Sequence, residues 1–577
     1  MGFHYTSERN VQIVLALLKA NNIKKVVASP GATNESIVAS MQYDPYFEMY
    51  SCVDERSAAY MACGMAAESG ETVVLSCTGA TSSRNYLPGL TEAFYRRLPI
   101  LAITSSMPTA NIGHLHAQCT NRSTPPVDAV KASYCIESVK NADDEWDRMI
   151  KVNKAISDLK KNGGGPVHLN LITRGCSDYS INELPSVNKI SQYFINEELP
   201  SLDNKKVMIF MGEHRPCTDD ETKVIDNFCA LHDTVVLCDH TSGYKGKYRV
   251  LSALAACQEI QNNKSLFTCD ILIHIGGISG DYYTLGAIKA SEVWRVDEDG
   301  EIRDRFKKLS AVFEMSPKYF FHYYSSNIDM RSDRLLEAFH TATDSLSKKI
   351  PELPFSNIWI ASKLSKTIPD NSVVHLGILN SLRAWNFFET KESVRTYCNV
   401  GGFGIDGIMS SLIGASLCDK SRKYFAVLGD LAFFYDINSL GNRHIGNNVR
   451  IMVINNGRGV EFHTYKHSAS KFGEDTDKFI AAYGHNGKQS PSLVKGISES
   501  LGFKYISAHN KEEFLQTYSD FVSEEKTEYP MVFEVFTEKI DDADVLRLIR
   551  TINGANKLLT LKQAGKDVIK SVINQLR

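Results

Sequence analysis

The segment Leu428–Gly459, "LGDLAFFYDINSLGNRHIGNNVRIMVINNGRG", places a polar side chain directly after each of two apolar runs. Asp430 follows the run "YFAVLG", and Asn456 follows the run "VRIMVIN". Continuous apolar runs of this length are typical of strands that are buried on both faces of a parallel sheet. Because open parallel sheets bind ligands at the carboxyl ends of their strands, the segment predicts an α/β fold and also the edge at which its site lies.

The same alternation of apolar runs and helical patterns fills the chain in three blocks. The first contains "KKVVASPG", "TVVLSCTGATSS" and "LPILAIT", the second "KVMIFMGE", "DILIHIGG" and "SEVWRVD", and the third "SVVHLG", "KYFAVLGD" and "PMVFEVF". Polar, proline-containing linkers at 182–203 and around "KKIPELPFSN" separate them. We therefore predict three successive doubly wound parallel-sheet domains at 1–182, 203–345 and 355–541. An amphipathic helical tail follows at 542–577, and we expect it to dock on the body of the protein or on a partner.

Charge and cysteine content narrow the class of protein. The 64 Lys and Arg against 67 Asp and Glu leave a net charge of -3, which predicts no strong field for nucleic acid or for an anionic membrane. The 13 cysteines are odd in number and scattered, which favours a reducing compartment over a disulfide framework. No apolar run approaches the ~18–20 residues that span a bilayer. We expect a cytoplasmic protein that acts on small molecules.

Asp430 and Asn456 bring together the oxygen ligands of a hard cation. A carboxylate, a carboxamide oxygen and a nearby main-chain carbonyl suit Mg²⁺ or Ca²⁺. Water and a phosphate-bearing ligand complete a site with so few protein ligands, and the backbone N–H groups at the helix start after Gly429 are donors for that phosphate. From the residues alone, a metal-bridged diphosphate site and a pair of ordinary turns remain equal alternatives.

The spacing from Gly-Asp to Asn-Asn resembles the thiamine-diphosphate motif of the 2-oxo acid decarboxylase and acetohydroxyacid synthase superfamily. This resemblance implies that Asp430, Asn456 and the main-chain carbonyl of Arg458 hold Mg²⁺, although the family usually has a small residue at the last position. It also implies that Glu55 is the catalytic acid at the aminopyrimidine of the cofactor. Asp54, beside it, is then an ordinary acid at a helix start.

Within that superfamily the chain is similar to the succinyl-enolpyruvyl-hydroxycyclohexene-carboxylate synthases of menaquinone biosynthesis. The resemblance rests on five motifs in order: Ser29-Pro30-Gly31, Asp54-Glu55-Arg56, Asn380-Ser381-Leu382, Gly404-Ile405-Asp406-Gly407 and the segment from Gly429 to Leu440. The cofactor contacts that it implies are Pro30, Gly31, Glu55, Asn380, Ser381, Gly404, Ile405, Gly429, Asp430, Leu431, Ala432 and Asn456. Ile405 matches the bulky apolar residue that supports the bent cofactor. The resemblance further implies a homodimer or homotetramer with active sites shared between subunits.

Three departures from the family pattern concern the substrate. The synthases use arginines to bind the carboxylates of their substrates, and in this alignment those positions are Thr33, Trp385 and Val400. Bidentate arginine is hard to replace in carboxylate recognition, so the departures argue against the synthase reaction itself. Arg383 is the one nearby residue that can substitute for a missing arginine.

The remaining polar candidates for contact with substrate lie in two short segments. They are His114, His116, Glu461, His463, Lys466 and His467, of which His116 and Glu461 are the preferred catalytic residues. The resemblance implies thiamine-diphosphate-dependent decarboxylation of a 2-oxo acid, with transfer of the acyl group to a carbonyl acceptor. The alternatives are a simple decarboxylase that releases an aldehyde, a cofactor-binding subunit without turnover, and another α/β enzyme acting on a nucleotide diphosphate.

Overall fold

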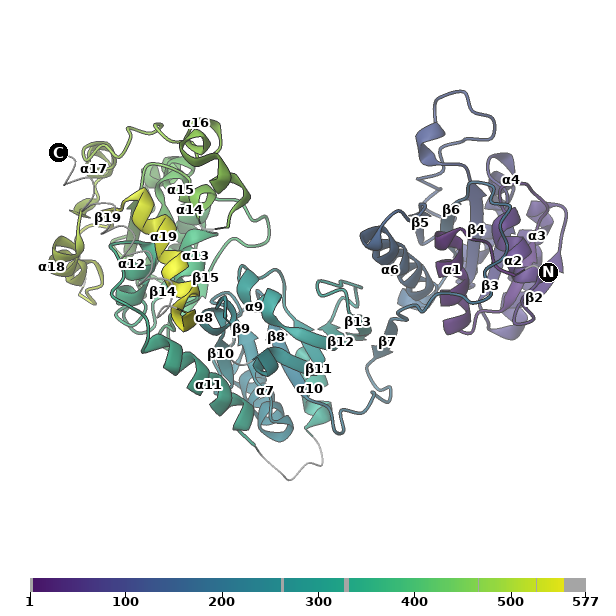
Figure 1. Ribbon diagram of the computed structural model, residues 1–577, viewed down its shortest axis with the longest axis horizontal. Coiled ribbons are helices and arrows are strands. Elements are labelled where there is room, and N and C mark those ends of the chain that lie inside the picture. The colour runs from purple at the N-terminus through teal and green to yellow at the C-terminus, as the bar shows by residue number, and fades with distance from the viewer. Residues whose placement is uncertain (1–3, 261–263, 326–331, 465, 526, 555–577) are drawn as a thin grey trace, which may run out of the picture. The chain divides into compact units, whose positions relative to one another are not determined.

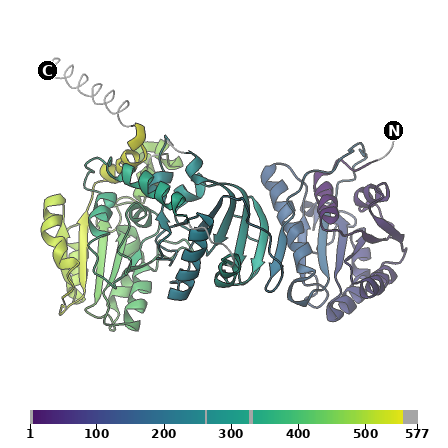
Figure 2. The same cartoon turned by 90° about the horizontal axis from the view of Figure 1, so that it is seen from below.

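The computed structural model describes residues 4–260, 264–325, 332–464, 466–525 and 527–554 (Figure 1). Within these residues the strands form three parallel sheets with helices on their faces, which confirms the predicted fold class (Figures 1 and 2). The chain divides into two compact units, a first of Met1–Glu197 with Asp299–Glu314 and a second of Glu198–Glu298 with Met315–Arg577. Each unit is described by itself.

The first unit contains a parallel sheet with the strand order β2-β1-β3-β4-β6-β5. Its strands are β1 (Lys25–Ala28), β2 (Glu48–Ser51), β3 (Val73–Cys77), β4 (Ile100–Ser106), β5 (Ala132–Ile136) and β6 (Val167–Ile172). Its helices are α1 (Arg9–Ala20), α2 (Glu35–Gln42), α3 (Glu55–Ser69), α4 (Thr81–Asn85), α5 (Leu87–Arg96) and α6 (Ala142–Asp158), with short 3-10 turns at η1 (Thr109–Asn111) and η2 (Lys161–Gly163).

Both faces of this sheet are buried. Val26 and Val74 pack into a core with α1 and α6, whereas their chain neighbours Val27 and Val73 pack into a second core with α3 and α5. Side chains alternate between the faces of a strand, so a strand covered on both sides must be apolar at every position. This is the physical reason for the uninterrupted apolar runs in the sequence.

The polar segment 182–203, expected to be a linker, contains a strand. β7 (Ser191–Phe194) pairs in parallel with β13 (Leu309–Glu314) inside the first unit. The ring of Tyr193 stacks on that of Phe313, with the ring centroids 5.0 Å apart. A strand of four half-buried residues gives too weak an alternation to be recognised between prolines and charged residues.

In the second unit, the central sheet has the order β10-β9-β8-β11-β12. Its strands are β8 (Val207–Met211), β9 (Val236–Cys238), β10 (Arg249–Leu251), β11 (Thr268–Ile275) and β12 (Lys289–Asp297). The helices of this region are α7 (Asp219–His232), α8 (Ala253–Ala256), α9 (Tyr282–Ala287), α10 (Pro317–Tyr324) and α11 (Arg334–Ser347), with a 3-10 turn at η3 (Lys264–Phe267).

The C-terminal sheet has the order β15-β14-β16-β17-β19-β18, which is the strand order of the first sheet repeated. Its strands are β14 (Val373–Leu376), β15 (Arg395–Tyr397), β16 (Tyr424–Gly429), β17 (Val449–Asn455), β18 (Lys504–Ala508) and β19 (Met531–Phe536). Its helices are α12 (Asn357–Leu364), α13 (Asn380–Trp385), α14 (Ile408–Cys418), α15 (Asp430–Tyr435), α16 (Thr476–Phe479), α17 (Leu493–Ser500), α18 (Lys511–Phe521) and α19 (Lys539–Arg550). The 3-10 turns are η4 (Ile437–Gly441), η5 (Val460–His463), η6 (Ser468–Asp475) and η7 (Ile552–Gly554).

The C-terminal helix α19 packs against α12 and the turn η5, at the end of the sheet where β17 terminates. Its apolar face contributes Val545, Leu546 and Ile549 to the interior. The predicted helical tail at 542–577 therefore begins inside α19, and its residues from 555 onward lie outside the described part of the chain. No helix in the described residues combines the length and the apolar character that a bilayer crossing requires.

Candidate functional site

Asp430 and Asn456 lie together at the carboxyl ends of two neighbouring strands. β16 and β17 run parallel, with Gly429 opposite Ile454, so both strands stop at the same level. The backbone N–H groups of Leu431 and Asn456 face the carboxylate of Asp430 and favour its charged form, which opposes the effect of burial on its pKa. The side chain of Asp430 is almost fully enclosed, at 4% exposed. The two residues thus share one edge of the sheet, as their positions after adjacent buried strands predict.

Three buried carboxylates gather at this edge: Asp430, Glu534 on β19 and Asp542 on α19. Burial raises the pKa of Asp430 to about 7, with a smaller contribution from the charge of Glu534. Burial likewise raises the pKa of Glu534 and that of Asp542. Across the described ranges no Lys, Arg or His nitrogen lies within 4.0 Å of any of the three. Buried carboxylates without a basic partner favour a bound cation.

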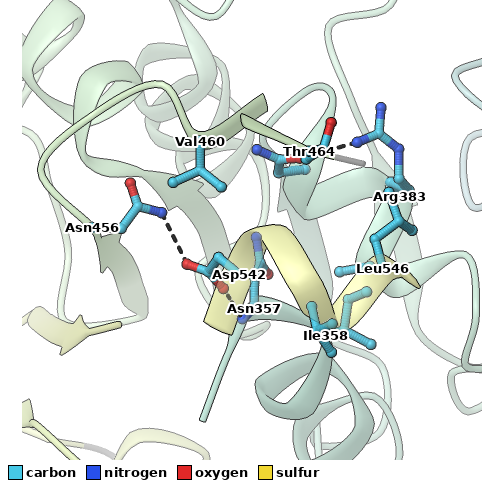
Figure 3. A pocket seen from close by; sticks show the side chains of 11 residues that line it. Asn357, Ile358, Arg383, Asn456, Val460, Thr464, Asp542 and Leu546 are labelled. Atoms are coloured by element: carbon cyan, nitrogen blue, oxygen red, sulfur yellow. Dashed lines mark hydrogen bonds between the residues drawn. The ribbon is translucent and has the colours of Figure 1, made fainter. Parts of the chain in front are cut away.

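The carboxamide of Asn456 has one end bonded and one end open (Figure 3). Its Nδ2 donates to Asp542 Oδ2 at 3.0 Å. Its Oδ1 is buried and has no hydrogen-bond partner among the residues that the structure describes. Buried polar atoms normally find a partner, so an open acceptor on the residue whose backbone N–H faces Asp430 fits a hard cation. The donor set therefore suits Mg²⁺.

Arg458, the unexpected residue in the predicted ligand set, is accommodated by its surroundings. Gly457 takes the positive φ of +73° in this turn, so position 458 needs no glycine. The guanidinium of Arg458 pairs with Asp477 and stacks over the ring of Tyr483, 3.9 Å from the ring centroid. The carbonyl of Arg458 accepts the N–H of Val460 at 3.1 Å, which leaves its second lone pair for another donor or a cation.

The other predicted cofactor residues of this unit lie on elements around the same edge. Asn380 and Ser381 begin α13, directly after Leu379, whose φ of +64° is a strained value for a branched side chain. Gly404 precedes Ile405, which packs against the core cluster beneath β16 and β17. A Cβ at Gly429 meets nothing within 4 Å, so the space beside it is open. Leu431 and Ala432 follow in the first turn of α15.

Arg383 lines the same pocket as Asn456 (Figure 3). Arg383 reaches Glu461 with two nitrogens, at 2.7 Å and 3.0 Å. It also donates to Asn380 Oδ1 at 3.0 Å. Each charge is therefore already satisfied by the other.

In the first unit, Glu55 is the first residue of α3. Its Oε2 accepts from Asn85 Nδ2 at 3.2 Å, and its side chain is half-buried. Asp54 is the N-cap of the same helix and accepts the N–H of Ser57 at 3.1 Å, which confirms its role as a helix-start acid. The exposed Pro30 and Gly31 follow β1, and a Cβ at Gly31 meets Thr78 Cβ at 2.4 Å, so no side chain fits there.

None of the three residues that depart from the family pattern, Thr33, Trp385 and Val400, has a positively charged side chain. Thr33 Oγ1 bonds to Thr78 Oγ1 at 2.5 Å and to the carbonyl of Ser105 at 2.9 Å. Trp385 is 0% exposed, and Val400 is 2% exposed. The last two are core residues, and substrate contact is closed to them.

The remaining polar candidates are spread over several places. His114 and His116 are exposed in the loop after η1. His463 pairs with Asp477 at 2.7 Å, Lys466 pairs with Glu259 at 2.6 Å, and His467 accepts the N–H of Ala469. Of this group, Glu461 is the residue that pairs with Arg383, which lines the pocket of Asn456, although Glu461 itself is not a lining residue.

Two residues of this edge were missed from the sequence, Glu534 and Asp542. Glu534 stands inside an ordinary apolar run, "PMVFEVF", and a single charge in a strand is itself a signal of a buried polar network. Asp542 carries no local signal, because an acid in the first turn of a helix is common.

Comparisons with known proteins agree with this geometry. Residues 9–125, which include Gly31 and Glu55, match the family model of the thiamine pyrophosphate enzyme, N-terminal TPP binding domain. The chain is 30% identical over 565 residues to the 2-succinyl-5-enolpyruvyl-6-hydroxy-3-cyclohexene-1-carboxylate synthase of Phocaeicola vulgatus, an alignment that covers 94% of this chain and 98% of the relative. It is 29% identical over 568 residues to the synthase of the same name from Bacteroides thetaiotaomicron, with the same coverage. The chain therefore belongs to the family of thiamine-diphosphate-dependent enzymes that contains these synthases.

Proposed function

We propose that the second unit binds the diphosphate of thiamine diphosphate through Mg²⁺, which Asp430, Asn456 and the carbonyl of Arg458 hold. The observation that carries this proposal is the open Oδ1 of Asn456, a residue whose backbone N–H faces the uncompensated carboxylate of Asp430. The other cofactor contacts in this unit are Asn380, Ser381, Gly404, Ile405, Gly429, Leu431 and Ala432. The bound cofactor supplies the carbon nucleophile that lets a 2-oxo acid lose CO₂.

The first unit provides the other half of the proposed site. Pro30 and Gly31 contact the pyrimidine, and Glu55 holds a proton at its ring nitrogen. Because Glu55 and Asp430 belong to different units of the chain, we propose that two chains build each site, so that the smallest active form is a homodimer. A homotetramer is the larger form of the same arrangement. We assign 1–182 to pyrimidine binding, 355–541 to the diphosphate and 203–345 to a central domain without a cofactor, in the cytoplasm.

The reaction we propose is decarboxylation of a 2-oxo acid followed by transfer of the acyl group to a carbonyl acceptor. A simple decarboxylase that releases an aldehyde is the second candidate, because the first step is common to both. In either case His116 and Glu461 are the proposed polar residues nearest to substrate chemistry.

The donor is proposed to lack a second carboxylate. Thr33, Trp385 and Val400 supply no guanidinium, and Arg383 is already satisfied by Glu461. Binding a further carboxylate there requires breaking a two-nitrogen ion pair. The relatives named as synthases favour the opposite choice, the synthase reaction, so the substrate test must include a dicarboxylic donor.

The test is a substrate panel with thiamine diphosphate and Mg²⁺. Pyruvate, a branched 2-oxo acid and 2-oxoglutarate are supplied with and without aldehyde or ketone acceptors, and CO₂ and the carbon product are measured. We expect CO₂ from a monocarboxylic donor and a ligated product when an acceptor is present. Turnover of 2-oxoglutarate alone contradicts the donor assignment, and no CO₂ from any donor favours the non-catalytic subunit.

A further inference from the structure

The carboxamide of Asn456 can adopt either of two orientations relative to Asp542. With Oδ1 turned away from Asp542, as in the structure, the open end offers a cation an acceptor, and with Nδ2 in that place it offers only N–H donors. The two orientations have nearly the same shape. A partner on the far side of the amide must therefore select between them.

Asp542 is that far-side partner (Figure 3). Its Oδ1 accepts the N–H of Asn357 at 2.7 Å. Its Oδ2 accepts from Asn456 Nδ2 at 3.0 Å and from the hydroxyl of Thr537 at 2.5 Å. An ionised carboxylate has acceptors alone, so the nitrogen of the Asn456 amide must turn toward it and the oxygen must turn away.

We infer that Asp542 is a positioning residue, which fixes the Asn456 amide with its oxygen toward the cation site. The inference rests on the proposed role of Asn456 as a ligand of Mg²⁺. It extends that role to the C-terminal helix, 86 residues further along the chain. Outer partners of this kind orient metal ligands in many proteins.

The helix that carries Asp542 is firmly held. Asp542 lies in the first turn of α19, and its N–H donates to the carbonyl of Glu538 at 3.0 Å. At the other end of the helix, Gln258 Nε2 donates to the carbonyl of Ile549 at 2.9 Å. The carboxylate thus stands on a rigid element that is packed into the second unit.

The isosteric change Asp542→Asn tests the inference, because the N–H of Asn357 fixes the orientation of the introduced amide. The N–H of Asn357 demands an acceptor, so Oδ1 of the introduced amide stays opposite it and the nitrogen takes the place of Oδ2. That nitrogen then donates to Asn456, whose amide inverts and presents Nδ2 to the cation site. The size of residue 542 is unchanged, yet the ligand is lost.

A reciprocal change should restore the site. In the double variant N456D/D542N, the amide at 542 donates to one oxygen of the carboxylate at 456. The other oxygen of that carboxylate then faces the cation site. A role of Asp542 in folding alone predicts no such recovery, because position 456 is changed as well.

The experiment measures Mn²⁺ affinity by electron paramagnetic resonance and thiamine diphosphate affinity by calorimetry at graded Mg²⁺. We expect D542N to weaken metal-dependent binding by about 10–100-fold, the usual effect of losing such a partner. The double variant should return to within about fivefold of the wild type, the residual coming from the altered ligand charge. Asp226→Asn is the matched control, since Asp226 accepts a hydroxyl from Tyr244 at 2.5 Å in the central sheet region.

The outcomes distinguish a failure of this inference from a failure of the proposed Mg²⁺ site. Wild-type protein that binds the cofactor equally well without a divalent ion contradicts the metal site itself, and the inference with it. Metal-dependent wild-type binding that D542N leaves intact contradicts only the inference. If D542N does not fold, as judged by circular dichroism, the double variant decides: folded protein that fails to bind Mn²⁺ overturns the inference, and folded protein that binds it supports the inference.

Discussion

Arg383, which lines the same pocket as Asn456, forms a two-nitrogen ion pair with Glu461, 78 residues further along the chain. The guanidinium of Arg383 lies in the pocket, but the carboxylate of Glu461 already compensates its charge. Bidentate pairs of this kind are among the stronger hydrogen-bonded contacts, so a substrate carboxylate has to displace one carboxylate to gain another.

The first prediction frees that guanidinium. Glu461→Gln keeps the shape of the side chain but removes the counter-charge from Arg383. We expect the Kd or KM for 2-oxoglutarate to fall about tenfold relative to that for a monocarboxylic 2-oxo acid, which corresponds to about 1.4 kcal/mol. The control is the double variant R383Q/E461Q, which has no cation to offer. Equal ratios in the single variant and the wild type refute the role of the pair in selecting the donor.

The second prediction concerns Glu55. Glu55→Gln should still bind thiamine diphosphate, because an amide keeps the shape and the contact to Asn85, but it cannot hold the required proton. Turnover should fall by at least about 100-fold, the lower range for loss of a general acid or base. Hydrogen–deuterium exchange at C2 of the bound cofactor reports the same step without substrate. Asp54→Asn, which retains the helix cap, is the matched control and should exchange normally.

The third prediction addresses assembly. Equal amounts of inactive Glu55→Gln and Asp430→Ala chains are mixed under conditions that exchange subunits. If each site takes one residue from each chain, a mixed dimer has one site with both lesions and one with neither. About a quarter of the wild-type activity should return for random pairing. No return of activity, with exchange verified by mass spectrometry, shows that each site is built within one chain.

The sequence was sufficient for the fold class and for the placement of Asp430 beside Asn456. Both follow from physics that acts locally: apolar runs report burial on two faces, and parallel strands align their carboxyl ends. The sequence could not predict the role of Asp542 or the pairing of Arg383 with Glu461. Each depends on which distant helix or turn packs over the sheet. The strand β7 was missed for a related reason, since its partner β13 lies more than 100 residues later.

The fourth prediction uses a buried neutral histidine of the first unit. His168 lies between Thr104 Oγ1 at 2.7 Å and Ser133 Oγ at 2.8 Å. Burial, aided by Arg122, lowers its pKa to about 3, whereas the unfolded chain takes up the proton near pH 6.5. Below about pH 6.5, His168 is therefore protonated in the unfolded state but stays neutral in the folded state. The free energy of unfolding should fall by up to about 1.4 kcal/mol per pH unit from this group.

The measurement is urea unfolding of the wild type and of His168→Gln at several pH values between 7 and 5, followed by circular dichroism. His168→Gln carries no titrating group at this position, so its stability should decline less steeply on acidification. Curves that stay parallel for the wild type and the variant indicate that His168 is protonated in the folded protein, contrary to its surroundings.

The central claim is that a divalent cation held by Asp430 anchors the cofactor, and calorimetry of thiamine diphosphate binding tests it most directly. Wild-type protein, Asp430→Ala and the surface control Asp419→Ala are titrated with and without Mg²⁺, and circular dichroism verifies that each is folded. We predict that the wild type and the control bind only with Mg²⁺, and that Asp430→Ala loses more than about 100-fold in affinity, since even outer partners of a metal ligand contribute 10–100-fold. Unchanged affinity in folded Asp430→Ala contradicts the account.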